Sequence, residues 1–181
     1  SPQRVSLTYE YLKEKGFEFN KPTVCSKEDV LLVHSNKLLK EVESGDFFEG
    51  DTPTLPNIFY FASLSAGSAI QTALSSLNGD TAFSLMRPPG HHATRDNLGG
   101  FCYFNNIAIA VMKAKQKVDK VAIVDLDCHH GNGTQDIFLG RKDIIYISLH
   151  QSPLYPGTGL RSERNCLNYS LPSQTGPDVY L

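Results

Sequence analysis

The chain has no tryptophan, only two methionines and no long hydrophobic run among its 181 residues. A helix that crosses a membrane needs roughly 20 consecutive apolar residues, and no stretch here comes near that length. The first residues, SPQRVSLTYE, also lack the apolar core of a secretory signal peptide. We therefore expect a cytoplasmic protein without a membrane partner.

Paired cysteines and an excess of charge are missing as well. The four cysteines are scattered without a Cys-x-x-Cys pair, which is not typical of a disulfide framework or a thiolate zinc site. Basic and acidic residues number 17 and 19, so the formal net charge is only −2. Because nucleic acid binding usually needs a basic surface, we expect no direct nucleic acid partner.

What is present is an ordinary globular composition, with 40% hydrophobic and 20% charged residues. A chain of this length can bury the core of one domain. The chain begins with Ser-Pro instead of Met, and it stops at PDVYL, where Pro177 is typical of a helix start. We therefore expect residues 1–181 to be a single domain that is the amino-terminal portion of a longer one.

Helical and strand-like segments alternate along the chain. Capping residues and apolar spacing predict helices over 1–15, from Ser26 across Leu39, over 59–77 and over 104–117. Short apolar runs predict strands at 81–86, 121–127 and 144–149. Strands separated by helices favour a mainly parallel sheet that is covered on both faces. The predicted fold is therefore a three-layer α/β/α sandwich.

The segment VAIVDLDCHHGNG, residues 121–133, joins an apolar strand to two aspartates and two histidines. Residues two apart on a strand point to the same side, so we expect Asp125, Asp127 and His129 to share one face. Carboxylate and imidazole are suitable zinc ligands, and a catalytic zinc takes about three protein ligands and a water. A polar strand end with one hydrogen-bonded histidine is the plainer alternative.

A second segment, MRPPGHHA at 86–93, follows a predicted strand and should leave the sheet at the same edge. It carries His91 and His92. Neutral imidazole is well matched to accepting and returning a proton near pH 7, so this pair is a candidate for acid-base catalysis. The alternative is that both histidines belong to an ordinary polar loop.

Two more loops are expected near this edge. GGFCYFNN, residues 99–106, places Phe101 beside glycines just before a helix, and SLHQSPLYPGTG, residues 148–159, carries His150 and Tyr155. From strand position alone, His150 is the residue inside the chain best placed to be a third metal ligand.

Taken together and in this order, RPPGHHA, GGFCYFNN, VDLDCHHGNGTQDIF and ISLHQSPLYPGTG resemble the zinc-dependent histone deacetylase family, which includes bacterial deacetylases and acetylpolyamine amidohydrolases. The opening SPQR resembles the end of that family's His-Pro-Glu-x-Pro-x-Arg motif, so the resemblance covers nearly the whole chain. RPPGHH is similar to the class II-like branch. The resemblance implies an arginase/deacetylase-like fold that is incomplete at the carboxyl end.

The resemblance also implies metal sites. It makes Asp127 and His129 ligands of a catalytic Zn²⁺. It further implies a structural K⁺ held by the same two residues together with Asp125, Ser148 and Leu149. In this family the third zinc ligand, an aspartate, lies beyond residue 181. The matching position of His150 is not a ligand there, which argues against it.

Carried over in the same way, His91 and His92 become the proton-transfer pair, and Asp125 orients His91. Asn132 falls where some relatives have an aspartate partner for the second histidine. An amide stabilises an imidazolium less than a carboxylate does, so we expect a lower pKa for His92.

The substrate site is implied by the same resemblance. Phe101 and Tyr155 match the aromatic walls of a narrow tunnel that admits an acyl-lysine side chain, and Gly100 accepts a contact from the substrate amide. Tyr155 stands where phenylalanine is more usual. PLYPGTG is more similar to the lysine deacetylases than to the polyamine enzymes.

The implied reaction is zinc-dependent hydrolysis that removes acetyl groups from acetylated lysine, a peptide or a polyamine. Zinc polarises the carbonyl and lowers the pKa of bound water towards about 7, with His92 as general base. A tyrosine that stabilises the oxyanion lies beyond residue 181 in the family. Two alternatives remain: a non-catalytic acyl-lysine-binding or scaffold module of the same fold, and, more weakly, arginase-type chemistry, for which the two-metal carboxylate cluster is missing.

Overall fold

Three parallel strands form the sheet of the computed structural model, which describes residues 2–180. They are β1 (Val121–Asp125), β2 (Ile144–Gln151) and β3 (Cys166–Leu171), and β2 lies in the middle. The register pairs Asp125 with Ser148, at the carboxyl end of β1. This pairing brings polar groups of two strands to one sheet edge.

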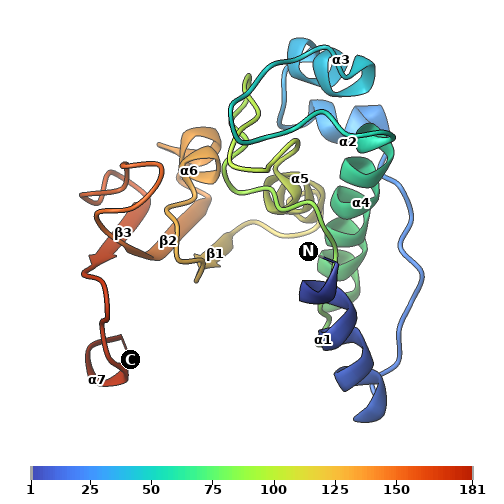
Figure 1. Cartoon of the computed structure of the whole chain (residues 1–181). Coiled ribbons are helices and arrows are strands. Elements are labelled where there is room, and N and C mark those ends of the chain that lie inside the picture. The colour runs from blue at the N-terminus through green and yellow to red at the C-terminus, as the bar shows by residue number, and fades with distance from the viewer. Residues whose placement is uncertain (1, 181) are drawn as a thin grey trace.

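Helices extend the domain beyond β1, and one helix packs on the sheet (Figure 1). Their bounds are α1 Gln3–Glu14, α2 Lys27–Leu31, α3 Asn36–Ser44, α4 Ile58–Leu77, α5 Asn106–Ala114, α6 Asn132–Phe138 and α7 Pro177–Tyr180. Figure 1 shows the strands in the order β3, β2, β1 towards α5 and α4, with α6 above the sheet. Together these elements make a mixed α/β structure around a parallel sheet, as predicted.

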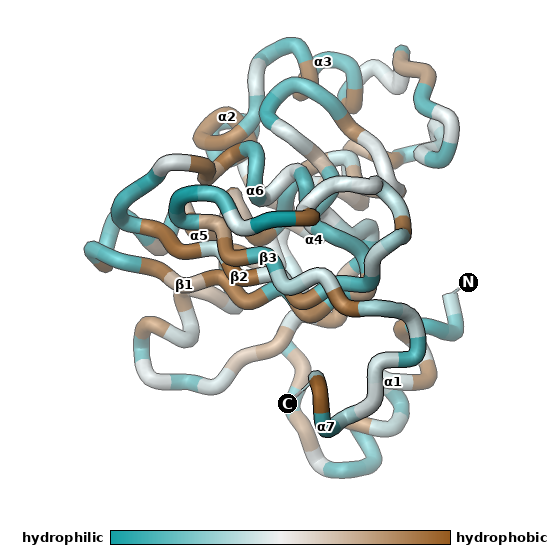
Figure 2. Tube along the Cα trace, turned by 90° about the vertical axis from the view of Figure 1, so that its left-hand side faces the viewer, coloured by the Kyte–Doolittle hydropathy of each residue, from teal (hydrophilic) through white to brown (hydrophobic). Residues whose placement is uncertain are grey.

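One hydrophobic core joins the helices to the sheet. It includes Leu38 of α3, Ala62 of α4, Ile109 of α5, Ile123 of β1 and Tyr146 of β2, all of them buried. Figure 2 shows hydrophobic residues concentrated along β1, β2 and α5, with hydrophilic residues in the surrounding loops. None of the helices that the structure describes is long and apolar enough to cross a membrane.

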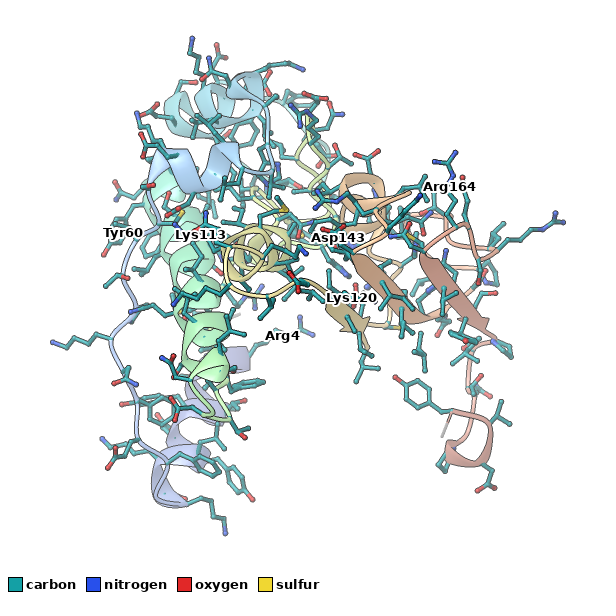
Figure 3. The ribbon with its side chains drawn as sticks, turned by 180° about the vertical axis from the view of Figure 1, so that it is seen from behind. Arg4, Tyr60, Lys113, Lys120, Asp143 and Arg164 are labelled. Carbon is teal, nitrogen blue, oxygen red and sulfur yellow. The ribbon has the colours of Figure 1, made fainter. Side chains whose placement is uncertain are left out.

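Ion pairs fix α5 against its neighbours. Lys113 contacts Asp29 of α2 at 2.8 Å, and Lys115 contacts Asp143, just before β2, at 3.0 Å. Arg141 adds a second cation to Asp143 at 2.8 Å. Figure 3 labels Lys113 and Asp143, which lie on opposite sides of α5. These contacts hold the carboxyl-terminal end of α5 against α2 and the start of β2.

The predicted helix from Ser26 across Leu39 is wrong in one respect, because it is two helices. Ser26 caps α2 as expected, but Ser35 interrupts the helix and caps α3 by accepting the Leu38 N–H at 3.3 Å. Leu38 and Leu39 are buried. His34, which lies in the break, is 1% exposed.

The predicted strand at 81–86 is also wrong. Within residues 2–180 the segment has no strand partner, and Phe83 is 77% exposed. An isolated extended segment has no ladder of hydrogen bonds, so alternation of side chains alone does not make a strand. The strand β3 and the short helix α6 were not predicted. Helix α1 was predicted, but none of its described residues is buried, and Ser1, the expected cap, lies outside the described residues.

Buried His34 connects α3 to the loop with His91 and His92. Its Nδ1–H donates to the Thr94 carbonyl, and its Nε2 accepts the Asn105 N–H, both at 2.8 Å. Asn105 in turn donates to the Ala93 carbonyl at 3.1 Å. Burial lowers the pKa of His34 to about 4. With both ring nitrogens committed, the histidine is held neutral.

This arrangement predicts a loss of stability in acid. In the unfolded chain His34 binds a proton below its usual pKa of about 6.5, whereas in the folded chain it does so only near pH 4. Between these two pH values the unfolded state binds more protons, so the free energy of unfolding falls as the pH falls. We expect about 3 kcal/mol less unfolding free energy at pH 4 than at about pH 7.5 from this residue alone. Denaturant unfolding of the wild type and of His34→Gln measures it. Equal pH slopes in the two proteins would contradict the prediction.

Candidate active site

The candidate site is built on the turn that follows β1. The strand ends at Asp125, so the expected sharing of one strand face by three side chains is wrong in its geometry. A tight turn gathers them instead. Asp125 Oδ1 accepts the Asp127 N–H at 3.1 Å, and Asp127 Oδ1 accepts the His129 N–H at 2.8 Å. The three side chains therefore lie together at the carboxyl end of the strand.

His91 lies against this turn. Its Nδ1 is 3.0 Å from Asp125 Oδ2, and its Nε2 is 3.9 Å from Asp127 Oδ1. Burial alone would lower the pKa of His91, but the Asp125 carboxylate raises it above its usual value. Burial would raise the pKa of Asp125, and the hydrogen bonds from His91 and Tyr146 lower it. The carboxylate is thus ionised, and His91 carries a proton on Nδ1.

His92 lies beside His91, with ring centroids 4.0 Å apart. Its Nδ1 is 2.8 Å from Asn132 Oδ1, so Nδ1 donates and Nε2 is left facing the site. Burial, and next the charge of His91, lower the pKa of His92 to about 4. The hydrogen bond to Asn132 raises the pKa, but less than burial and His91 lower it, so the low pKa that was expected is due mainly to burial. At pH 7 this imidazole is neutral.

Tyr146 is a member of the site that the sequence analysis missed. Its hydroxyl donates to Asp125 Oδ2 at 2.9 Å, and its ring is fully buried in the core. A Cβ on Gly131 would lie 2.4 Å from both the Asp125 carboxylate and the Tyr146 hydroxyl. The glycine is therefore needed for close approach. A tyrosine within an apolar strand is the available signal, because a buried hydroxyl needs a partner.

The turn with Gly100 and Phe101 forms another side of the site. Both residues have positive φ, 57° and 63°, and a Cβ on Gly100 would lie 2.3 Å from the His92 ring. The Gly100 N–H donates to Asp51 Oδ1 and the Phe101 N–H to Thr52 Oγ1, both at 2.9 Å. Asp51 and Thr52 were also missed by the sequence analysis, and nothing in their local pattern marks them.

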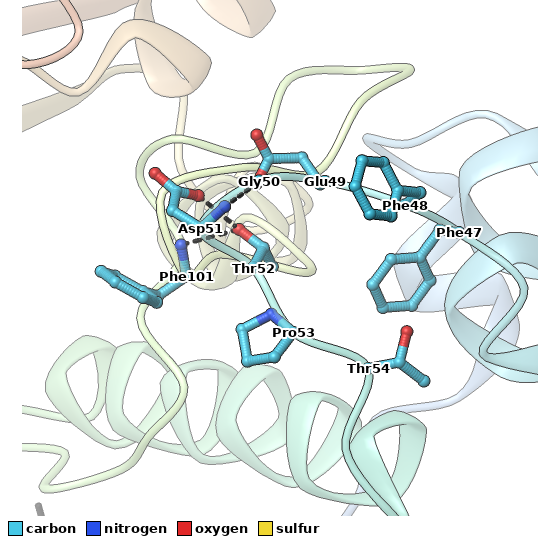
Figure 4. Close-up of a pocket in the computed structure, with 9 residues that line it drawn as sticks. All are labelled: Phe47, Phe48, Glu49, Gly50, Asp51, Thr52, Pro53, Thr54 and Phe101. Atoms are coloured by element: carbon cyan, nitrogen blue, oxygen red, sulfur yellow. Dashed lines mark hydrogen bonds between the residues drawn. The ribbon is translucent and has the colours of Figure 1, made fainter.

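A pocket of about 550 Å³ lies next to this turn. It is lined by residues 47–54 and by Phe101, whose side chain is 57% exposed. Figure 4 shows Phe101 across from Pro53, with the hydrogen bond from its N–H to Thr52. The Phe101 ring is therefore accessible to solvent from the side of this pocket.

Tyr155 completes the ring of aromatic groups. Its ring centroid is 5.0 Å from that of His92 and 6.2 Å from that of His129, and its side chain is 45% exposed. The Tyr155 hydroxyl is 3.8 Å from the position of a Cβ on Gly99, the residue before the Gly100 turn. Loops far apart in sequence thus come together over the two histidines, as expected.

His150 is not placed to be a third ligand, so this expectation is wrong. The side chain is 2% exposed. Its Nε2 donates to the Gly159 carbonyl at 3.1 Å, and its Nδ1 therefore accepts from the Ser148 hydroxyl at 2.9 Å. Both nitrogens are used. Ser148 is fully buried opposite Asp125, and Leu149 follows it on β2.

Asp127 and His129 fit a shared metal ion. His129 Nδ1 hydrogen bonds to Asp127 Oδ1 at 3.0 Å, so the two donors lie side by side and need to separate by only a few tenths of an ångström to reach the separation of about 3.4 Å between two ligands of one tetrahedral zinc. Their side chains are 51% and 42% exposed, which leaves room for further ligands. Within residues 2–180 no group of three or more His, Cys, Asp or Glu side chains could hold a metal. This chain thus supplies two donors, one fewer than a catalytic zinc usually takes.

Comparison with known proteins gives relatives of one kind. A probable deacetylase from Archaeoglobus fulgidus is 41% identical over 99% of this chain and 55% of its own length. An acetylpolyamine amidohydrolase from Burkholderia pseudomallei is 40% identical over 71% of this chain and 40% of its own length. The chain thus spans about half the length of the curated relatives it matches.

A solved structure and a family match agree with these relatives. The crystal structure of the HDA15 HD domain matches with a TM-score of 0.86 and 34% identity, covering 92% of this chain and 53% of that one. The fold is therefore that of the arginase/deacetylase-like proteins. Residues 1–181 match the histone deacetylase domain. The chain belongs to the histone deacetylase family.

Proposed function

We propose that the complete protein is a zinc-dependent amide hydrolase that removes acetyl groups from lysine side chains or related amines. The observation that carries the proposal is the packing of two imidazoles against a pair of metal-type donors. His91 and His92 have ring centroids 4.0 Å apart, and His91 Nε2 is 3.9 Å from Asp127. A module that only binds acyl-lysine has no need for paired proton carriers.

In this proposal Asp127 and His129 hold zinc, because their donor atoms meet at one point on an exposed side of the turn. When bound there, zinc supplies a Lewis acid that polarises the amide carbonyl and acidifies a coordinated water. The third protein ligand and an oxyanion-stabilising tyrosine come from polypeptide outside this chain. Residues 1–181 are then the amino-terminal portion of one deacetylase domain.

The two histidines divide the proton transfers. His92 is neutral at pH 7 and presents Nε2 to the site, so it accepts a proton from the attacking water. Asn132 holds the opposite ring nitrogen and fixes the tautomer. His91 is held by Asp125, which favours its protonated form and suits it to protonate the leaving amine.

The substrate reaches this point between Phe101 and Tyr155. Both rings are partly exposed. Tyr155 lies against His92, and Phe101 follows Gly100, whose backbone packs on the His92 ring, so an extended side chain with an apolar stem would pass between the two aromatic rings. Gly100 brings backbone close to the His92 ring and offers its carbonyl to the substrate amide. Relatives named as a deacetylase and an acetylpolyamine amidohydrolase support an acetylated amine as substrate.

We also propose a structural K⁺ beneath the turn. Asp125 and Ser148 are register partners at the ends of β1 and β2. Because Ser148 gives its proton to His150, its oxygen lone pairs stay free for a cation. Backbone carbonyls of Asp127, His129 and Leu149 would complete the site.

Acetate release is the test of the proposed reaction. The complete protein, loaded with zinc, is incubated with an acetyl-lysine peptide and separately with an N-acetylated polyamine. We expect stoichiometric acetate and free amine from at least one of them. Tight binding of both compounds without acetate, in protein that is folded and contains zinc, would support the non-catalytic binding module instead.

A further inference from the structure

Tyr146 is placed to control the orientation of the Asp125 carboxylate. The Asp125 Oδ2 atom accepts two hydrogen bonds, from Tyr146 at 2.9 Å and from His91 at 3.0 Å. Oδ1 accepts the Asp127 N–H at 3.1 Å. Both carboxylate oxygens are therefore occupied, and rotation of the carboxylate would break all three hydrogen bonds.

The Tyr146 hydroxyl is a fixed donor. Its ring is 0% exposed and belongs to the hydrophobic core, on the strand that pairs directly with β1. Burial, and then the Asp125 charge, raise the pKa of Tyr146, so the hydroxyl keeps its proton. A donor anchored by the core holds its acceptor more firmly than a surface group or a water would.

The space around these atoms leaves little freedom. The Cβ position of Gly131 lies 2.4 Å from Asp125 Oδ2 and from the Tyr146 hydroxyl, and 3.0 Å from His91 Nδ1. Carboxylate, phenol and imidazole thus meet at one point with no room for a side chain between them. If the Asp125 carboxylate moves, the His91 ring that is hydrogen bonded to it must move as well.

We propose that Tyr146 is a positioning residue that acts through Asp125, holding its Oδ2 in line with His91 Nδ1 and so fixing the His91 ring for proton transfer. This inference rests on the proposed hydrolase function. Tyr146 itself touches neither substrate nor metal. Its role goes beyond packing, because the ring alone fills the core and only the hydroxyl reaches Asp125.

The test is Tyr146→Phe in the complete protein, compared with Ile144→Val. The first keeps the ring and removes the hydroxyl. The second removes one methyl group from a buried residue of the same strand that does not contact Asp125. We expect Tyr146→Phe to lower kcat by about 10- to 100-fold, the usual effect of losing such an outer partner, with KM unchanged. Ile144→Val should lower thermal stability and leave kcat unchanged.

A second readout does not depend on the reaction. Proton NMR follows the His91 Nδ1–H, identified by its absence from His91→Ala. We expect this proton to exchange with water faster in Tyr146→Phe and at the wild-type rate in Ile144→Val. If the wild type releases no acetate, the hydrolase proposal fails, and the NMR comparison still tests the positioning role. Unchanged kcat, or equal proton exchange in wild type and Tyr146→Phe, would overturn it.

Discussion

Replacing His92 with alanine should lower kcat of the complete protein by about 10²- to 10⁴-fold, the range typical for loss of a positioned general base. The reason is geometric. His92 Nδ1 is taken by Asn132, so Nε2 alone is available to accept a proton, and the ring of His129, whose centroid is 6.0 Å away, is assigned to zinc. The other close ring, His91, is engaged by Asp125 and favours the protonated form.

Stability and zinc content are the controls for this variant. His92 is only 6% exposed, but it does not belong to the hydrophobic core, so His92→Ala should fold and bind zinc as the wild type does. Initial rates with a saturating acetylated substrate give kcat. A folded, zinc-loaded His92→Ala that keeps a rate close to that of the wild type would show that another group accepts the proton.

The second large effect that we expect is a loss of zinc binding when Asp127 is replaced by asparagine (Asp127→Asn). The amide oxygen can still accept the His129 N–H that Asp127 Oδ1 accepts at 2.8 Å, so the turn should survive. The negative charge and the preferred oxygen donor are lost. We expect zinc affinity to fall by at least about 100-fold, measured by competition with a chelating dye, together with the rate of acetate release.

Cys128→Ser is the matched control for Asp127→Asn. Cys128 lies between the two proposed ligands, is exposed and has a free thiol, a group that binds zinc well when ionised. Because the site is argued from Asp127 and His129 alone, the serine variant should bind zinc as the wild type does. Loss of zinc from Cys128→Ser, with Asp127→Asn unaffected, would mean that the donors are assigned wrongly.

Local patterns in the sequence were sufficient to predict much of the fold. The helical spacing of α4 and α5 and the apolar run of β2 carry their own signals, because each buries a regular face, whereas β1 was recognised from its apolar run alone and buries only Ile123. The segment 81–86 has an equally apolar pattern but no strand beside it among the described residues. Whether a segment pairs with a neighbouring strand depends on the tertiary structure. The wrong prediction of a strand at 81–86 could therefore not be avoided from the sequence of the segment alone.

The candidate site could be predicted only where its residues sit in motifs. The His91 and His92 pair and the Asp127 and His129 pair are each contiguous or nearly so, and the parallel sheet brings them together. Thr52 and Tyr146 contribute through single hydrogen bonds across long sequence separations. Their roles depend on where loops and strands meet. A tyrosine in an apolar strand signals a buried hydroxyl that needs a partner, but it does not say which residue the partner is, and Thr52 stands in a loop without a motif.

The most direct test of the central claim is acetate release by the complete protein before and after its zinc is removed and restored. If zinc is held by Asp127 and His129 beside His91 and His92, the zinc-free protein should release no acetate. Acetate release should recover when zinc alone is added. His92→Ala should bind the restored zinc without recovering activity. Release that persists without metal, or that is absent from folded protein with zinc bound, would contradict the claim that these residues form a zinc-dependent deacetylase site.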